Sequence, residues 1–169
     1  MITVASWNVN SIRARLTHLT EWLALAKPDI LGVQETKVQD HEFPAAELAE
    51  LGYHSVFSGQ KSYNGVAVLA RRPITALATA IPGFADLQRR VLAVELEDFV
   101  FLNLYVPNGS SVGSDKYDYK LRWFAALREY VAAELARHQN LVVLGDYNVA
   151  PEDRDVHDPK AWEGSVHVS

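Results

Sequence analysis

Four polar clusters in the sequence each come directly after an apolar run. Glu35 and Asp146 supply two carboxylates, and Asn8 and Asn148 supply two carboxamides. Oxygen ligands of this kind suit a hard cation such as Mg²⁺, which proteins hold through one or two carboxylates together with waters and phosphate oxygens. The sequence has no cysteine, which excludes disulfides and thiolate metal sites. The pattern therefore favours metal-assisted hydrolysis of a phosphoester. The clusters are Trp7-Asn8-Val9-Asn10, Gln34-Glu35-Thr36-Lys37, Tyr105-Val106-Pro107-Asn108 and Asp146-Tyr147-Asn148.

Each cluster also has an ordinary structural interpretation. Asn and Asp at a strand end are commonly turn formers or helix caps. In this interpretation, Asp146 forms an Asx-turn with Tyr147-Asn148, and Glu35 is an ordinary surface carboxylate. The four clusters together favour a shared site, because active sites of layered α/β folds gather where strands end.

The elements that must position these clusters follow from hydrophobic periodicity. An apolar stripe predicts a helix from Ile12 to Ala26, and Pro44 opens a short second helix. A longer helix is predicted near 115–137, with Phe124, Leu127, Val131 and Leu135 facing inward. Together these elements predict a central sheet with helices on an outer face. Strands are expected near 2–9, 29–34, 53–58, 65–71, 74–80, 91–97, 99–106 and 141–144.

Length and charge set the broad limits. A chain of 169 residues, 49% of them hydrophobic, fits one domain with a real core and no apolar run of membrane-spanning length. No signal peptide is visible, so a cytoplasmic protein is expected. The net charge of −5 argues mildly against nucleic acid as a partner. The placement of basic pairs such as Arg89-Arg90 matters more than this sum.

Five segments, in order and with matching spacers, resemble the motif set of the exonuclease III family, within the endonuclease/exonuclease/phosphatase superfamily. The presence of Asn10 makes the bacterial branch the more similar one. The resemblance implies an α+β fold, a layered α/β sandwich of the DNase I-like type. The segments are Ser6-Trp7-Asn8-Val9-Asn10-Ser11-Ile12-Arg13-Ala14, Gln34-Glu35-Thr36-Lys37, Gln88-Arg89-Arg90-Val91, Asn103-Leu104-Tyr105-Val106-Pro107-Asn108-Gly109 and Gly145-Asp146-Tyr147-Asn148.

The same resemblance implies an activity. It points to a base-excision-repair enzyme that uses Mg²⁺, or Mn²⁺ in its place. The expected substrate is double-stranded DNA with abasic sites or 3′ ends. Cleavage would occur 5′ to abasic sites, and 3′ ends would be trimmed.

The resemblance also implies roles for individual residues. The expected metal ligands are Glu35, with Asn8 beside it, and Asp146, which alternatively activates the attacking water. Asn148 is expected to hold Asp146, to bind the scissile phosphate and to join the metal site. Tyr105 is expected to stabilise the phosphate in the transition state. The expected DNA contacts are Arg90 and Asn108, with Lys37 next to the metal.

One part of the family pattern has no match. The family continues to a Ser-Asp-His triplet, and His167, within Ser165-Val166-His167-Val168-Ser169, is not a substitute for it. We therefore expect residues 1–169 to be the N-terminal portion of a single domain. This portion would supply the first sheet and the outer helices, lack most of the second half, and be inactive alone.

Two other functions remain open at this point. One is a superfamily phosphatase that acts on a small phosphoester, and the other is a non-catalytic module that binds DNA or merely folds. The segments around Arg90 and 105–108 favour DNA over a small phosphoester. No protein partner is inferred.

Overall fold

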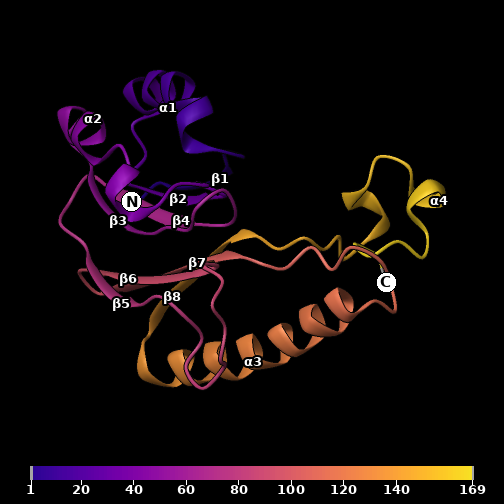
Figure 1. Cartoon of the computed structure of the whole chain (residues 1–169). Coiled ribbons are helices and arrows are strands. Elements are labelled where there is room, and N and C mark those ends of the chain that lie inside the picture. The colour runs from indigo at the N-terminus through magenta and orange to yellow at the C-terminus, as the bar shows by residue number, and fades with distance from the viewer. Residues whose placement is uncertain (1, 169) are drawn as a thin grey trace.

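Two four-stranded sheets pack face to face between layers of helices in the computed structural model, which describes residues 2–168 (Figure 1). The first sheet has the order β1-β2-β4-β3 and the second β5-β6-β7-β8. The layered sandwich predicted from the sequence is confirmed. The strands are β1 (Val4–Asn8), β2 (Ile30–Gln34), β3 (His54–Ser58), β4 (Val66–Ala70), β5 (Thr75–Ala78), β6 (Val91–Leu96), β7 (Phe99–Tyr105) and β8 (Asn140–Asp146).

The expectation of one central sheet, with this chain supplying only the first, is wrong. Every residue of β2 and of β4 is buried, so both strands are covered on two faces. Helices cover one face of the first sheet, and strands β5–β8 form a second sheet that packs on its other face. Ile30 and Val68 of the first sheet pack with Leu92 and Phe101 of the second. The apolar runs predict each strand, but they do not show which sheet a strand joins.

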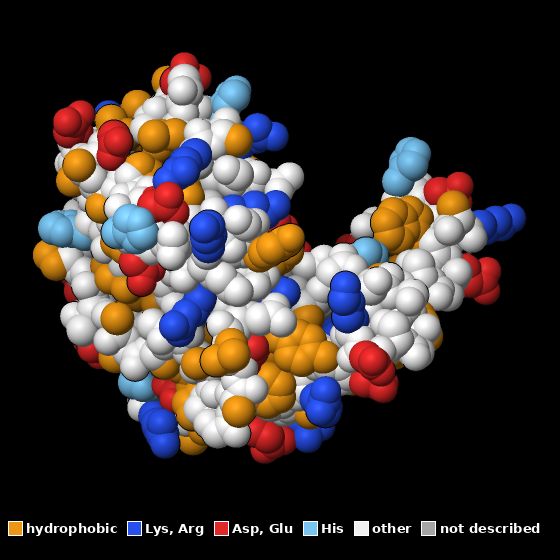
Figure 2. Space-filling view, viewed as in Figure 1, with side chains coloured by type: hydrophobic (Ala, Val, Ile, Leu, Met, Phe, Trp, Pro, Cys, Tyr) orange, Lys and Arg blue, Asp and Glu red, His pale blue; other side chains and the backbone are white. Residues whose placement is uncertain are grey.

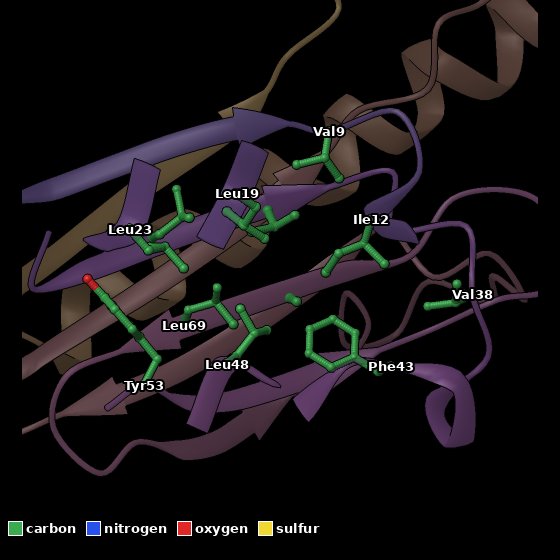
Figure 3. Packing of buried hydrophobic residues seen from close by; sticks show 12 residues of the cluster. Val9, Ile12, Leu19, Leu23, Val38, Phe43, Leu48, Tyr53 and Leu69 are labelled. Atoms are coloured by element: carbon green, nitrogen blue, oxygen red, sulfur yellow. The ribbon is translucent and has the colours of Figure 1, made fainter. Parts of the chain in front are cut away.

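Helices cover the outer faces of the sandwich. Figure 3 shows Leu19 and Leu23 of α1 (Ile12–Ala26) and Leu48 of α2 (Ala45–Glu50) in the cluster on the outer face of the first sheet. The side chain of Ser11 caps α1 by accepting a hydrogen bond from the backbone N–H of Ala14. A 3₁₀ turn, η1 (Asp40–Glu42), precedes α2.

The long helix α3 (Asp115–Arg137) has the predicted bounds, and its buried face differs from the predicted one in part. Trp123 and Leu127 pack beneath it on the second sheet, whereas Leu135 is 59% exposed. The inward orientation predicted for Leu135 is therefore wrong. Phe124 and Val131 are partly buried against the same cluster, so the predicted stripe lies at the border of the buried face. The buried residues of α3 are Lys120, Trp123, Leu127, Tyr130 and Glu134.

The strand directions bring four strand ends to one end of the sandwich. β1 runs parallel to β2, and β7 runs parallel to β8. β1 and β8 are the edge strands of their sheets, and they lie against each other across the sandwich. Between β8 and Val168, the chain forms only the short 3₁₀ turn η2 (Asp153–Asp155) and the single-turn helix α4 (Pro159–Trp162). No helix within residues 2–168 is long and apolar enough to cross a membrane.

Candidate active site

The amide of Asn8 joins two carboxylates that come from different sheets. Its Nδ2 lies 2.8 Å from Oε1 of Glu35 and 2.7 Å from Oδ2 of Asp146. Asn8 ends β1, Glu35 directly follows the neighbouring strand β2, and Asp146 ends β8. The two carboxylates would repel each other without a donor between them. The structure therefore brings together the two anionic residues that the sequence analysis selected.

Glu35 receives hydrogen bonds from three groups. Besides Asn8, the ammonium of Lys37 lies 2.8 Å from Oε2, and the hydroxyl of Tyr105 also donates to this carboxylate. Burial favours the neutral form, but the donors outweigh it, so the pKa of Glu35 is lowered from its usual value. Lys37 also contacts Oδ1 of Asn10. The carboxylate is thus kept ionised at a half-buried position.

Tyr105 ends β7 and keeps its proton at neutral pH. Burial, followed by the hydrogen bond to Glu35, raises the pKa of Tyr105 to about 12. The guanidinium of Arg90 lies over the ring, 4.7 Å from its centroid, and donates to the Tyr105 carbonyl oxygen at 3.1 Å. Tyr105 is therefore a fixed hydrogen-bond donor beside the two carboxylates.

Asp146 forms the Asx-turn that its sequence context permits, and it also reaches the site. Its Oδ1 accepts a hydrogen bond from the backbone N–H of Asn148 at 3.0 Å, while Oδ2 faces Asn8. Gly145 has a φ of +139°, and a Cβ there would lie 2.0 Å from the carbonyl oxygen of Leu104. Asp146 is thus both a turn former and a residue of the candidate site.

The carboxamides predicted as metal ligands use their oxygens within the protein. Oδ1 of Asn8 accepts from the backbone N–H of Asn10 at 3.0 Å. Oδ1 of Asn148 accepts from Nδ2 of Asn108 at 3.3 Å, and its own Nδ2 donates to the carbonyl oxygen of Val106 at 2.9 Å. Glu35 and Asp146 are therefore the residues of this set with anionic oxygens facing the site.

His167 lies at this site, although the sequence analysis set it aside. Its Nε2 is 2.9 Å from Nδ2 of Asn108. Its ring packs edge-on against the ring of Trp162, with 5.5 Å between the ring centroids. Burial, followed by the positive charge of Lys120, lowers the pKa of His167. Its Nδ1 is buried without a partner among the described residues. No sequence signal predicts the contact, because it joins positions 59 residues apart.

Left-handed backbone conformations concentrate around these side chains. Residues other than glycine adopt positive φ only at an energetic cost, and such residues cluster at functional sites. Glu35 and Asn148, which lie in the site itself, have φ of 54° and 48°. The other left-handed residues beside the site are Asn10, Ser11 and Lys37.

An open hollow of about 540 Å³ adjoins Arg90, whose guanidinium lies over the ring of Tyr105. Arg90, Asn108 and Lys116 contribute to its lining, and none of the described residues that line it is acidic. A second hollow, of about 550 Å³, contains Asp146, Asn148 and His167. Figure 2 shows the surface hollowed between the main body and the C-terminal segment. A chain with a net charge of −5 thus presents cations and amides next to its two central carboxylates.

The fold and this arrangement define a class of protein. Residues 5–165 match the model of the endonuclease/exonuclease/phosphatase family, and the chain belongs to that family. It is similar to exodeoxyribonuclease III of Haemophilus influenzae, with 32% identity over 89% of this chain and 59% of that protein.

Comparison with solved structures also finds nucleases and phosphatases of this kind. A 3′ phosphatase from Neisseria, bound to a product DNA hairpin, is 43% identical with a TM-score of 0.91. An AP endonuclease from Archaeoglobus fulgidus is 39% identical with a TM-score of 0.94. The match covers 99% of this chain and 65% of each of those chains, so this chain spans about three fifths to two thirds of its relatives' length.

Proposed function

We propose that this chain belongs to a metal-dependent DNA phosphodiesterase of base-excision repair. The reaction is hydrolysis of the phosphodiester 5′ to abasic sites, together with trimming of 3′ ends. One observation carries the proposal: Asn8 joins Glu35 and Asp146 where the ends of both sheets meet, with Tyr105 beside them. The names of the relatives, an exodeoxyribonuclease, an AP endonuclease and a 3′ phosphatase, support the same chemistry.

The donor set fits a hard divalent cation. Glu35 and Asp146 would hold Mg²⁺, or Mn²⁺ in its place, with Asn8 orienting both carboxylates from the side. Within residues 2–168, no group of three or more His, Cys, Asp and Glu side chains is placed to hold a metal. Waters and phosphate oxygens would complete the ligand set, as is common for Mg²⁺. When bound, the cation supplies neutralisation of charge on the phosphate.

The other steps of hydrolysis are assigned to side chains whose protonation state or orientation already suits their role. Tyr105 is protonated, and its single O–H, which donates to Glu35 in the free protein, would turn to a phosphate oxygen as negative charge develops there. Asp146 is ordered by its turn and accepts a proton from the attacking water. Asn148 is held through Val106 and has a second amide N–H for the phosphate, and Asn108 orients Asn148 by donating to its Oδ1. Donors fixed before the reaction stabilise the transition state without reorganisation.

The shape and charge of the neighbouring hollow favour DNA over a small phosphoester. Its lining extends from Arg90 to Lys116, across residues 107–110, and it is open to solvent. A single small headgroup would leave most of such a surface unused, whereas a nucleic-acid backbone presents a phosphate at each nucleotide. Arg90 and Asn108 would contact phosphates here, and Lys37 would lie beside the metal. The cytoplasmic location inferred from the sequence stays a prediction.

Cleavage assays with matched substrates test the proposal. A duplex with one abasic site, a duplex with a 3′-phosphate end, and an inositol phosphate would each be incubated with Mg²⁺, with and without EDTA. We expect a longer chain to cleave both duplexes only when the metal is available, and residues 1–169 alone to cleave neither. Cleavage of the inositol phosphate alone would contradict the DNA assignment. Salt-dependent duplex binding without cleavage in either chain would favour the non-catalytic module.

A further inference from the structure

Lys120 is buried inside the protein, and no carboxylate of residues 2–168 forms an ion pair with it. It lies near the start of α3 and is 3% exposed. Its Nζ donates to three backbone carbonyl oxygens, those of Asn148 at 2.7 Å, Val166 at 3.0 Å and Asn108 at 3.2 Å. Burying a charge is costly unless hydrogen bonds compensate it, so this arrangement needs a reason.

The number of hydrogen bonds that Nζ donates indicates the protonation state of Lys120. A neutral amine has two N–H groups, whereas an ammonium has three and no acceptor. Three carbonyl oxygens are therefore satisfied together only by the charged form. The positive charge of Lys120 stays within the protein, where it acts over several ångströms because the local dielectric constant is low.

The three carbonyl groups belong to segments that are far apart in the sequence. One follows β7, one follows β8, and one lies in the C-terminal turn. Each segment carries a polar side chain of the candidate site. Nδ2 of Asn108 lies 3.3 Å from Oδ1 of Asn148 and 2.9 Å from Nε2 of His167. Lys120 thus holds together the backbones whose side chains meet on the surface above it.

The packing around Lys120 leaves little room for rearrangement. Gly109 has a φ of +93°, and a Cβ there would lie 3.0 Å from Cδ of Lys120 and 2.8 Å from Cγ2 of Val166. The absence of a side chain at Gly109 lets the lysine stem pass between these segments. The hydroxyl oxygen of Ser114, at the N-cap of α3, lies 3.1 Å from the Gly109 carbonyl oxygen and 2.7 Å from that of Ser111.

We propose that Lys120 is a positioning residue that assembles Asn108, Asn148 and His167 into one phosphate-binding face and places a positive charge beneath it. The proposal rests on the proposed function and names the residue that organises its phosphate site. Lys120 does not touch substrate, because all of its N–H groups are used within the protein. Its effect is preorganisation: three loop segments are fixed before a phosphate arrives, so binding does not have to order them.

Phosphate binding to three variants tests the positioning role. Inorganic phosphate would be titrated into the wild-type chain and followed through the side-chain amide NMR signals of Asn108 and Asn148. Lys120→Met keeps the length of the stem but removes the charge, and we expect affinity to fall about tenfold or more. Lys120→Arg keeps the charge and should bind with intermediate affinity. Arg122→Met, an exposed position on the same helix, removes an equal charge and should leave affinity unchanged.

The variants give clear contrary outcomes. Wild-type affinity in Lys120→Met would overturn the proposal, and so would an equal loss in Lys120→Met and Arg122→Met, which would show an effect of net charge alone. A third contrary result is an equal loss in Lys120→Met and Lys120→Arg accompanied by global unfolding in urea, which would assign Lys120 to stability only.

Hydrogen exchange in the wild-type chain tests, without any variant, whether Lys120 holds the three segments together. We call this set of three hydrogen bonds the clamp. The backbone amides of Ser110, Asn148 and Val168 lie in the three segments and are hydrogen-bonded. We expect them to share one opening free energy, because one ammonium holds all three segments. Independent openings would overturn the clamp. If wild type binds no phosphate while the segments still open together, the phosphate face and the proposed function fail, and the clamp alone stands.

Discussion

At the scale of single residues, the short polar side chains of the site each use their two polar atoms differently. One oxygen of Asp146 shapes the turn to Asn148, and the other reaches Asn8. Asn8 repeats this division, because its oxygen binds the backbone of Asn10 and its amide N–H groups face the carboxylates. A turn former is thereby also a site residue. This double use holds the site atoms rigidly, since the turn and the site share one side chain.

Replacing Asp146 by asparagine should separate chemistry from binding. The amide keeps an oxygen for the turn but cannot accept the proton of the attacking water. Turnover should fall ~10²–10³-fold, the usual effect of losing one preorganised polar contact at such a centre. Duplex affinity should stay the same or rise, because a negative charge is removed. Single-turnover cleavage and duplex titration, in a version of the protein with measurable turnover, check this. Near wild-type cleavage by Asp146→Asn would leave only the turn-forming role.

Arg90 should show the opposite behaviour. Its side chain is held by the ring and carbonyl oxygen of Tyr105 and by Gln88, whose Oε1 accepts from Nε at 2.8 Å. Arg90→Ala should weaken duplex binding and reduce the salt dependence of log Kd by about one, since one phosphate contact is lost. Affinity across a salt series checks this. Arg128→Ala, an exposed position on the far part of α3, is the control and should leave the slope as in wild type.

Glu35 should be the main determinant of metal binding. Mn²⁺ should broaden NMR signals near Asn8 and Glu35, with weak affinity because a hard cation finds only two anionic ligands among the described residues. Glu35→Ala should remove this response, whereas Glu42→Ala, at a partly exposed carboxylate that pairs with Arg13, should keep it. An unchanged response in Glu35→Ala would place the metal elsewhere.

At the scale of elements, the close approach of the two sheets positions the strand ends. A Cβ at Gly32 in β2 would lie 2.1 Å from Cδ1 of Leu144 in β8 and 3.0 Å from Oδ1 of Asn103 in β7. Nδ2 of Asn103, which is fully buried, donates to the carbonyl oxygens of Val33 at 3.0 Å and Ala67 at 2.9 Å. A glycine and a buried amide thus join the sheets directly below the site.

Gly32→Ala should therefore destabilise the chain. Overpacking of a filled interior costs roughly 1–3 kcal/mol, and the midpoint of urea unfolding should fall accordingly. Adding Leu144→Ala should recover part of the loss caused by Gly32→Ala, because the methyl group then has space. A double-mutant cycle measures this coupling. Strict additivity of the two substitutions would show that the sheets do not approach as closely as described.

At the scale of the whole molecule, an apolar groove adjoins the open edge of the second sheet. β8 is an edge strand, and between it and α3 lies a groove of about 450 Å³ that includes Phe124, Val131, Leu135 and Val143. Unpaired strand edges and exposed apolar surface both promote association. The basic hollow that favours DNA lies elsewhere, around Arg90 and Asn108.

The chain should therefore self-associate as its concentration rises. Sedimentation velocity over a concentration series should show a growing oligomer fraction, which Leu135→Lys should reduce because it places a charge in the groove. Leu25→Lys, on the exposed face of α1 and 85% exposed in wild type, should have little effect. A monomeric chain at all concentrations, with high thermal stability, would contradict this prediction.

The sequence by itself determined the elements, the family and the residue types of the site. The helix at Asp115–Arg137 and the ends of β1, β2 and β7 follow from local periodicity and caps, which neighbours in the sequence supply. The order of the five motifs indicates the family, which the comparison confirms. The roles of the individual site residues remain predictions.

Only the tertiary structure decided which atoms of these residues meet. The division of the strands into two sheets, the buried stripe of α3, and the convergence of Asn108, Asn148 and His167 on Lys120 depend on contacts between segments far apart in the chain. Such contacts leave no local periodicity, because each is a match of shape and hydrogen bonding between surfaces that exist only after the strands have paired. A lysine on an amphipathic helix is usually exposed, and only the three facing carbonyl oxygens make this one a buried cation.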